Sequence, residues 1–390
     1  MNLSCVNADH GFCTKPTGHV MPCCISSQRV VNNSGDMAIL NKDLAKDIWQ
    51  SQYLIDLRQD LSNGIQHPNC SQCWSEEAAG YKSKRLRDNE RWVDLVNEPT
   101  GELPKLLDLS LGNTCNLACR TCGTFASSRW YKETQRMPSM SITVKDENKQ
   151  LNDQIQECYA DESSIWSFLD ETLPQVLHID LYGGEPLLVK RHWTMLKSIP
   201  LADAKNISLH FNTNGTQWDD NYAEVLCRFK EVRADISIDG VGPVFEYMRW
   251  PAKWDQVSAN IQNFKNLSLN NPQIMVSICI TLSILNIWSL PETVEYTKEL
   301  GTNCYLNLLH NPVPMNLQSL SPKAAGLVLA QLDSISHEQI ASVKEFIRAG
   351  GEYRQSRTNE LFKLLQEHDT LRDQQFRRLN PVLYKALIDV

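Results

Sequence analysis

The 390-residue chain has no long run of Lys or Arg, no Gly-x4-Gly-Lys segment and no internal repeat. Its 38 basic and 46 acidic residues give a formal charge of −8, and scattered charge of this kind does not point to a nucleic-acid partner. The most apolar stretch, residues 274–290, is interrupted by Ser, Thr and Asn. It is too short and too polar to span a membrane.

The first residues, MNLSCVNADHGFC, lack the basic flank and the apolar run of a secretory signal peptide. We therefore expect a cytoplasmic protein. In a reducing compartment, thirteen cysteines argue against a disulfide framework and favour metal ligation or redox chemistry. An apolar content of 42% supplies a large core, and the length suggests two or three domains.

Six short apolar runs alternate with helix-length amphipathic segments in the middle of the chain. Runs of this kind are typical of buried parallel strands. They predict an α/β fold, and six units fall short of the eight in a closed barrel. We expect an open, partial (β/α)6 barrel, with a doubly wound sheet as the alternative. The runs are residues 106–112, 176–184, 207–215, 233–240, 274–282 and 304–310.

The remaining segments set the expected domain boundaries. Residues 1–100 are rich in cysteine and form one module, residues 101–320 form the barrel, and the charged, strand-free residues 321–390 form a helical C-terminal cap. The polar segment 132–152 is longer than most connections, and it is either a lid or a disordered insertion.

A cysteine triplet, Cys115-x3-Cys119-x2-Cys122, follows the first apolar run directly. Three thiolates on one loop can hold a cubane iron–sulfur cluster and leave one iron open, whereas a zinc site normally recruits a fourth ligand. Zinc binding, or three reduced thiols without a metal, remains the alternative.

In this position the triplet resembles the signature of radical S-adenosylmethionine (SAM) enzymes. The resemblance implies a 4Fe–4S cluster whose open iron binds the amino and carboxyl groups of SAM. The segment Gly183-Gly184-Glu185-Pro186 matches the family's GGEP motif, whose backbone and carboxylate hold the SAM amino group. Thr121 departs from the family pattern, in which an aromatic residue rests against the adenine.

Further positions resemble SAM-binding segments at the ends of later strands. The resemblance implies that Ser and Asp hydrogen-bond the ribose and that an arginine pairs with the SAM carboxylate. Asn-Gly and Asp-Gly are also ordinary turn formers, so a simple turn is the competing interpretation. The positions are Asn212, Asn214, Ser237, Asp239, Arg249 and Asn286.

The N-terminal cysteines form a second group, which could make a four-thiolate site for a cluster or for structural zinc. The group resembles a twitch, or shortened SPASM-like, auxiliary-cluster module, and two helices are expected within residues 36–64. The expected ligands are Cys13, Cys70 and Cys73, with Cys24 or Cys23 as the fourth. Cys5 is expected to be a mobile N-terminal thiol, with a place as an alternative ligand of the auxiliary site. The single cysteines Cys158, Cys227, Cys279 and Cys304 are expected to be core or spectator thiols.

The resemblance extends to the C-terminal HDTLRDQQF segment and implies a radical SAM oxidoreductase. Its 5′-deoxyadenosyl radical takes a substrate hydrogen, and the auxiliary cluster, expected to be 4Fe–4S, accepts an electron. The expected reaction is oxidation or cross-linking of a ribosomal peptide, with a flavodoxin or ferredoxin as reductant and with no nucleic-acid or membrane partner. The alternatives are dehydrogenation of an aminocyclitol, sugar or nucleotide, a non-catalytic iron–sulfur electron-transfer protein, and a zinc-binding interaction module.

Overall fold

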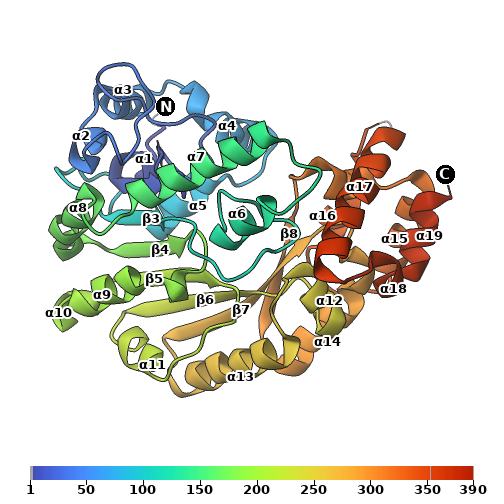
Figure 1. Ribbon diagram of the computed structural model, residues 1–390. Coiled ribbons are helices and arrows are strands. Elements are labelled where there is room, and N and C mark those ends of the chain that lie inside the picture. Colours follow the sequence, from blue (N-terminus) through green and yellow to red (C-terminus); the bar gives the residue numbers. More distant parts are fainter. Residues whose placement is uncertain (1–2, 352, 390) are drawn as a thin grey trace.

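The computed structural model describes residues 3–351 and 353–389. Within them an eight-stranded sheet runs in the order β2-β1-β3-β4-β5-β6-β7-β8 (Figure 1). The six predicted runs form β3 to β8, and each is parallel to its neighbour. The sheet keeps two edges, β2 and β8, so the prediction of an open α/β fold with six units is confirmed. The six strands are Leu106–Ser110, His178–Tyr182, Ser208–Thr213, Glu231–Ser237, Ile274–Leu282 and Asn303–Leu308.

The N-terminal residues contribute two strands that the sequence did not predict. Strand β1 (Gly11–Thr14) is antiparallel to β2 (Val20–Met21) and parallel to β3. The module is therefore joined to the barrel by backbone hydrogen bonds. Five helices complete it, and α2 and α3 are the two predicted ones. They are α1 (Val6–His10), α2 (Ala45–Trp49), α3 (Gln52–Ser62), α4 (Ser71–Ala78) and α5 (Lys84–Arg91).

The two faces of the sheet differ in polarity because side chains alternate along each strand. The outer face is apolar and packs against helices. Phe12 lies 5.0 Å from Phe168 of α8 (Ser164–Thr172), measured between ring centroids, and Phe211 lies 6.5 Å from Phe264 of α13 (Trp254–Asn270). Other helices after the strands include α9 (Lys190–Ser198), α11 (Asn221–Leu226) and α14 (Leu290–Leu300). The inner face carries polar and charged residues.

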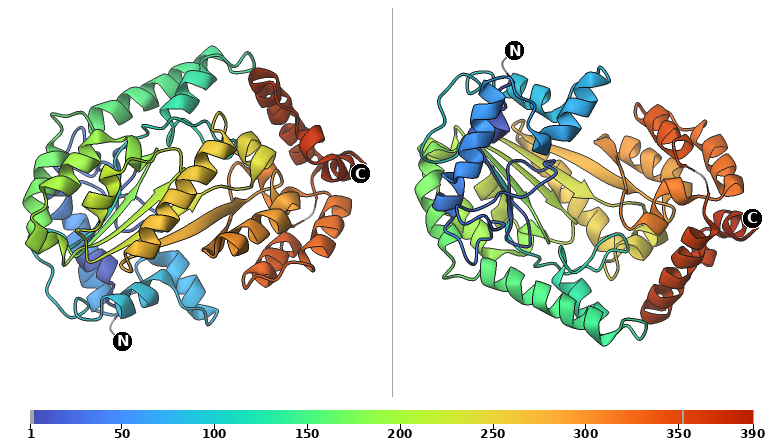
Figure 2. Two further views of the ribbon diagram at one scale, coloured as in Figure 1. Left: turned by 90° about the horizontal axis from the view of Figure 1, so that it is seen from below. Right: turned by 90° about the horizontal axis from the view of Figure 1, so that it is seen from above.

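The polar segment 132–152 is helical over most of its length. It continues α6 (Ser128–Thr134) and begins α7 (Ile142–Cys158). The Ser141 hydroxyl accepts a hydrogen bond from the backbone N–H of Val144 at 3.3 Å and caps α7. The disordered alternative is therefore wrong. Both views in Figure 2 show α7 extending from the N-terminal module toward the C-terminal helices.

The C-terminal region is helical, as predicted, and lies beyond β8 (Figure 1). It also reaches back to the loop that follows β3. Arg120, beside Cys119, places its Nη2 atom 2.7 Å from Asp369 Oδ1. The main helices are α15 (Pro322–Leu332), α16 (Ile340–Arg348), α17 (Gln355–Arg372) and α19 (Pro381–Ile388). Among the described residues no helix is both long enough and apolar enough to cross a bilayer.

Candidate functional site

The cysteine triplet lies on the loop that follows β3, and the segment after α12 (Gly242–Met248) holds this loop in place. The backbone N–H of Ala118 donates to the Trp250 carbonyl at 2.8 Å, and that of Arg120 donates to the Met248 carbonyl at 2.9 Å. These two hydrogen bonds bracket Cys119. The loop shape is thus set by contacts within the protein.

The three thiols of the triplet lie within electrostatic range of one another. Burial first, and then the neighbouring Cys119, raise the pKa of Cys115 and Cys122 to about 12. Burial also raises the pKa of Cys119. A positively charged iron–sulfur core would favour the thiolate form that burial opposes.

Two glycines bring the end of β4 against the start of this loop. Gly183 has a φ of +82°, which a side chain rarely tolerates. A Cβ on Gly184 would lie 2.1 Å from the Thr114 carbonyl oxygen. The backbone N–H of Glu185, which follows, donates to that same oxygen at 2.7 Å. Both glycines are needed for this close backbone approach.

The Glu185 carboxylate is buried and braces the next strand end. It accepts hydrogen bonds from the Thr213 hydroxyl at 2.8 Å and from the backbone N–H of Asn214 at 2.6 Å. A third comes from the backbone N–H of Leu187, and burial raises the pKa of Glu185 to about 7. The carboxylate thus accepts three hydrogen bonds inside the protein, only one of them on Oε2, and its contact with the SAM amino group stays a prediction.

The end of β5 lies beside the first cysteine of the triplet. The Asn214 Nδ2 atom is 3.8 Å from the Cys115 sulfur and 3.0 Å from the Asn116 Oδ1 atom. The Asn212 Oδ1 atom is buried and has no hydrogen-bond donor among the described residues. An unpaired buried acceptor near the end of β5 fits a ligand with a donor group.

Asp239 and Arg249 form a buried ion pair at the second cysteine. Arg249 Nη2 lies 2.8 Å from Asp239 Oδ2, and its Nη1 atom lies 4.0 Å from the Cys119 sulfur. Asp239 has a φ of 59° and accepts from the backbone N–H of Thr281 at 2.7 Å. The Arg249 Nε–H group is buried and finds no acceptor among the described residues. This free donor fits an anionic ligand such as a carboxylate.

Asn286 uses all its hydrogen-bonding capacity within the protein. Its Nδ2 atom donates to the carbonyls of Asp239 and Thr281, and its Oδ1 atom accepts from the N–H and hydroxyl of Ser283. The geometry makes it a loop brace, and a direct contact with SAM would break one of these bonds. Ser237 lies at the end of β6, on the inner face, beside Cys279.

The N-terminal cysteines meet in a different combination from the expected one. A single small cavity is lined by Cys5, Cys23, Cys70 and Cys73. Burial, together with the smaller effect of the neighbouring thiols, raises the pKa of Cys5, Cys23 and Cys70 to about 12. Cys5 is also buried, so its expected mobility is wrong. Four thiols around one cavity fit a fully ligated cluster.

Cys13 and Cys24 line a second cavity, on the barrel side of the hairpin, and Cys23 lines both cavities. Strand alternation explains the position of Cys13, because Phe12 points toward the outer helices and the next residue must point inward. Cys13 pairs with Asp108 in the sheet register, and Cys24 hydrogen-bonds the Asp108 side chain. The geometry thus favours Cys5 and Cys23 over Cys13 and Cys24 as partners of Cys70 and Cys73.

The two cysteine groups therefore fit iron–sulfur clusters by the chemistry of their donors. Among the described residues no three His, Cys, Asp or Glu side chains stand close enough to hold a single metal ion. Of the isolated cysteines, Cys279 lies on the inner face, where the Asn307 Nδ2 atom is 3.2 Å from its sulfur. Cys158 is buried, and Cys227 and Cys304 are partly buried.

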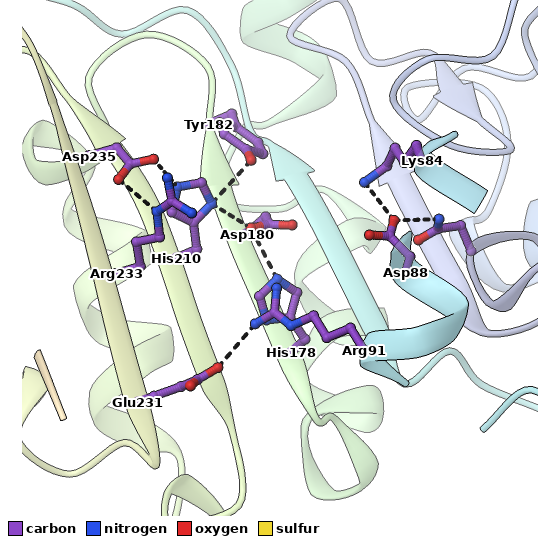
Figure 3. Close-up of polar contacts among 11 residues, drawn as sticks. Lys84, Asp88, Arg91, His178, Asp180, Tyr182, His210, Glu231, Arg233 and Asp235 are labelled. Carbon is purple, nitrogen blue, oxygen red and sulfur yellow. Dashed lines mark hydrogen bonds and ion pairs between the residues drawn. The ribbon is translucent and has the colours of Figure 1, made fainter. Parts of the chain in front are cut away.

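A charged network that sequence analysis did not identify crosses the inner face of the sheet (Figure 3). His210 Nδ1 lies 2.7 Å from Asp180 Oδ1, and His210 Nε2 lies 3.0 Å from Asp235 Oδ2. Arg233 Nε donates to Asp235 at 2.8 Å, and the Tyr305 hydroxyl donates to it at 2.9 Å. The network gives the interior of the partial barrel a polar, hydrogen-bonding wall.

Comparison with known proteins places two domains on the chain. A model of the radical SAM superfamily matches residues 109–297, and a model of the SPASM iron–sulfur cluster-binding domain matches residues 5–74. The sporulation killing factor maturation protein SkfB of Bacillus subtilis (strain 168) is 24% identical over 222 residues. The match covers 54% of this chain and 46% of SkfB, so the chain spans about half the length of that relative.

Two solved structures show weaker similarity. The enzyme anSMEcpe with bound AdoMet has a TM-score of 0.37 and 16% identity, covering 60% of this chain and 57% of that one. Streptococcus suis SuiB bound to S-adenosylmethionine has a TM-score of 0.35 and 13% identity, covering 83% of this chain and 61% of SuiB. The matched domains imply a 4Fe–4S cluster with SAM and an auxiliary iron–sulfur cluster. The chain therefore carries a radical SAM domain over residues 109–297, with a SPASM iron–sulfur cluster-binding domain ahead of it over residues 5–74.

Proposed function

We propose that the chain is a radical SAM enzyme that oxidises its substrate, with residues 1–100 holding the auxiliary cluster, 101–320 the SAM site, and 321–390 closing the barrel. The observation that carries the proposal is the convergence of the cysteine triplet, Asn214 and the Asp239–Arg249 pair on one loop. SAM cleaved by one electron at such a cluster supplies the group that removes a hydrogen atom from substrate.

The residues of the site have distinct proposed roles. Cys115, Cys119 and Cys122 ligate three irons, and the free Nε–H of Arg249 pairs with the SAM carboxylate. Asp239 orients Arg249 through its 2.8 Å contact. The close backbone packing at Gly183 and Gly184 shapes the amino-group site, while Glu185 holds the loops together.

The N-terminal module supports oxidation rather than rearrangement. After a hydrogen atom leaves, a substrate radical must lose one electron and one proton to give an oxidised product. Cys5, Cys23, Cys70 and Cys73 supply four thiolates, which leave no iron open and suit electron acceptance. The inner-face network, with Asp235 and His210, lines the space where substrate would lie.

The first test is release of 5′-deoxyadenosine from anaerobically reconstituted protein supplied with SAM and dithionite. We expect release from the wild type and loss of release when Cys115, Cys119 and Cys122 are all changed to Ala. Cys227→Ala is the matched control, because this thiol contacts Asn271 far along the chain from the triplet. A protein with a full iron complement but no release, with or without added candidate substrates, would instead support an electron-transfer protein.

We propose a peptide as the substrate class. The support is the similarity to SkfB, whose name assigns it to maturation of a killing factor, together with the polar wall inside the barrel. Release of 5′-deoxyadenosine should rise with a pool of synthetic peptides and not with aminocyclitols, sugars or nucleotides. Stimulation by one of the small-molecule pools alone would establish the small-molecule dehydrogenase instead.

A further inference from the structure

A buried arginine from the C-terminal helix α17 lies against the cysteine loop. Its guanidinium carbon is 5.2 Å from the ring centroid of Trp130 and 5.2 Å from that of Trp250. The Arg372 side chain is fully buried. Burying a guanidinium is costly unless its charge is used or compensated.

Both tryptophans are fixed to the loop itself. Trp130 Nε1 donates to the Cys119 carbonyl at 2.7 Å, and the Trp250 carbonyl accepts from the Ala118 N–H at 2.8 Å. Cys122 packs in the same small cluster as these rings. Arg372 is thus separated from the cysteine backbone by one layer of aromatic side chain.

Arg372 forms a buried ion pair with Glu133 of α6. Its Nε atom donates to Glu133 Oε1 at 2.8 Å, and its Nη2 atom lies 2.7 Å from the same oxygen. Its Nη1 atom is buried with no acceptor among the described residues. The guanidinium thus faces the two tryptophans of the loop, and the opposite charge of the carboxylate lies directly beside it.

Two other arginines near the loop are also ion-paired, and a third stacks on one of the same tryptophans. Arg120 contacts Asp369 at 2.7 Å, and Arg249 contacts Asp239 at 2.8 Å. Arg129 stacks on Trp250, with its guanidinium carbon 4.8 Å from the ring centroid. Arg249 and Arg372 both oppose the rise that burial imposes on the pKa of Cys119.

We propose that the Arg372–Glu133 pair sets the reduction potential of the cluster held by the triplet, so that α17 is part of the redox site rather than only a cap. This inference rests on the proposed function, since it requires the cluster. Reduction adds one negative charge to the cluster. A nearby cation stabilises the reduced form, and a nearby carboxylate destabilises it.

The test is an anaerobic redox titration of the full-length reconstituted protein, followed by the EPR signal that changes when SAM is added. At a fixed potential, Arg372→Gln should lower the ratio of reduced to oxidised cluster by about tenfold, which corresponds to about 59 mV for one electron. Glu133→Gln should raise that ratio. The double variant should return close to the wild-type potential.

Shifts of the reduction potential in opposite directions in the two single variants distinguish a charge effect from damaged packing. Potentials that stay unchanged in both single variants, or that move in the same direction, would overturn the inference. If Arg372→Gln loses the cluster, the variants Glu133→Gln and Arg372→Lys test the inference instead. Glu133→Gln should still raise the reduction potential. Arg372→Lys keeps the positive charge and should therefore keep the wild-type potential.

A matched control comes from a second arginine–tryptophan stack. The Arg58 guanidinium carbon lies 4.1 Å from the Trp49 ring centroid, within the N-terminal module. Arg58→Gln should leave the potential of the SAM-responsive signal unchanged. If the wild type shows iron but no SAM-responsive signal, the proposed function fails, and that outcome differs from a SAM-responsive cluster whose potential ignores Arg372 and Glu133.

Discussion

His210 is the central residue of the inner-face network. It sits between Asp180 and Asp235, which lie on the neighbouring strands β4 and β6 (Figure 3). Burial lowers the pKa of His210, but hydrogen bonds and charge from both carboxylates outweigh it, and the pKa rises to about 9. The folded protein therefore binds this proton more tightly than an unfolded chain does.

This shift predicts a pH-dependent stability. The contribution of His210 should be complete below pH 6.5, on the order of 3 kcal/mol, and should fade as pH rises toward 9. Chemical unfolding of the wild type and of His210→Gln, from pH 6 to pH 9.5, checks it. A stability difference that stays constant over this range would show that the imidazole only fills space.

The auxiliary ligands give a second prediction. Cys5→Ser should remove about four irons per chain, because a cluster missing one of four thiolates is weakly held. Cys13→Ser should keep the full complement, since Cys13 lines the other cavity. Iron analysis and Mössbauer spectra of the two variants measure the difference. Iron loss in Cys13→Ser alone would restore the assignment made from sequence.

The site residues differ in how far the sequence could predict their roles. The spacing of Cys115, Cys119 and Cys122 was sufficient to expect a shared site, since one short loop carries all three. Cys5 was considered only as an alternative ligand, because nothing in the sequence shows which N-terminal cysteine folds back to meet Cys70 and Cys73. The sequence also did not predict that Asn286 hydrogen-bonds its own loop. An asparagine at the end of a strand can bind a ligand or stabilise a loop, and the sequence pattern is the same in both cases.

At the scale of elements, β8 is an edge strand of the sheet, and side chains from the C-terminal region hydrogen-bond its otherwise unpaired backbone groups. Gln339 Oε1 accepts from the Leu306 N–H at 2.7 Å, and its Nε2 atom donates to the Leu306 carbonyl at 3.2 Å. His337 lies 3.3 Å from the Cys304 carbonyl. A side-chain amide here takes the place of a neighbouring strand and blocks edge-to-edge pairing.

Removing this cover should weaken the edge. Gln339→Ala is expected to cost about 1–3 kcal/mol, because both polar groups of the buried Leu306 lose their partners. Amide hydrogen exchange at Leu306, together with chemical unfolding, measures the loss. The variant Gln331→Ala, which removes one hydrogen bond to the Trp288 carbonyl, is the control and should leave Leu306 protection unchanged.

Helix α7 shows why one element was misjudged. Its residues are mostly polar and exposed, so hydrophobic periodicity was weak, and only Ile155 and Cys158 are buried. Local signals were nevertheless present. Ser141 caps its N-terminus, and Lys149 and Asp153 form an i,i+4 ion pair. Such local support specifies a helix where the apolar pattern does not.

At the scale of the whole molecule, the N-terminal module and the barrel share one sheet. The Lys105 N–H donates to the His10 carbonyl at 2.9 Å, and the Ser110 N–H donates to the Thr14 hydroxyl at 2.9 Å. Alternation of strands and helices was enough to predict six barrel strands. Strand β1 is only four residues long and has no helix between it and β2, so the same pattern could not reveal it.

The shared sheet predicts that the barrel does not fold alone. A fragment of residues 101–390 would expose the backbone edge of β3 and the surface around Phe168, which Phe12 normally covers. We expect it to aggregate in size-exclusion chromatography. Co-expression of residues 1–100 as a separate chain should restore a monodisperse complex. A monodisperse fragment without that partner would contradict this view and show that residues 101–390 fold independently.

The pairing of β1 with β3 also has a consequence for synthesis. Gly11 lies opposite Leu106 in the sheet register, and at a typical translation rate the ribosome needs roughly 5 to 20 seconds to make the residues between them. During that interval the nascent hairpin has no strand to join, and Cys13 has not yet met Asp108 of β3. One backbone edge of β1 therefore stays open in the growing chain until β3 emerges.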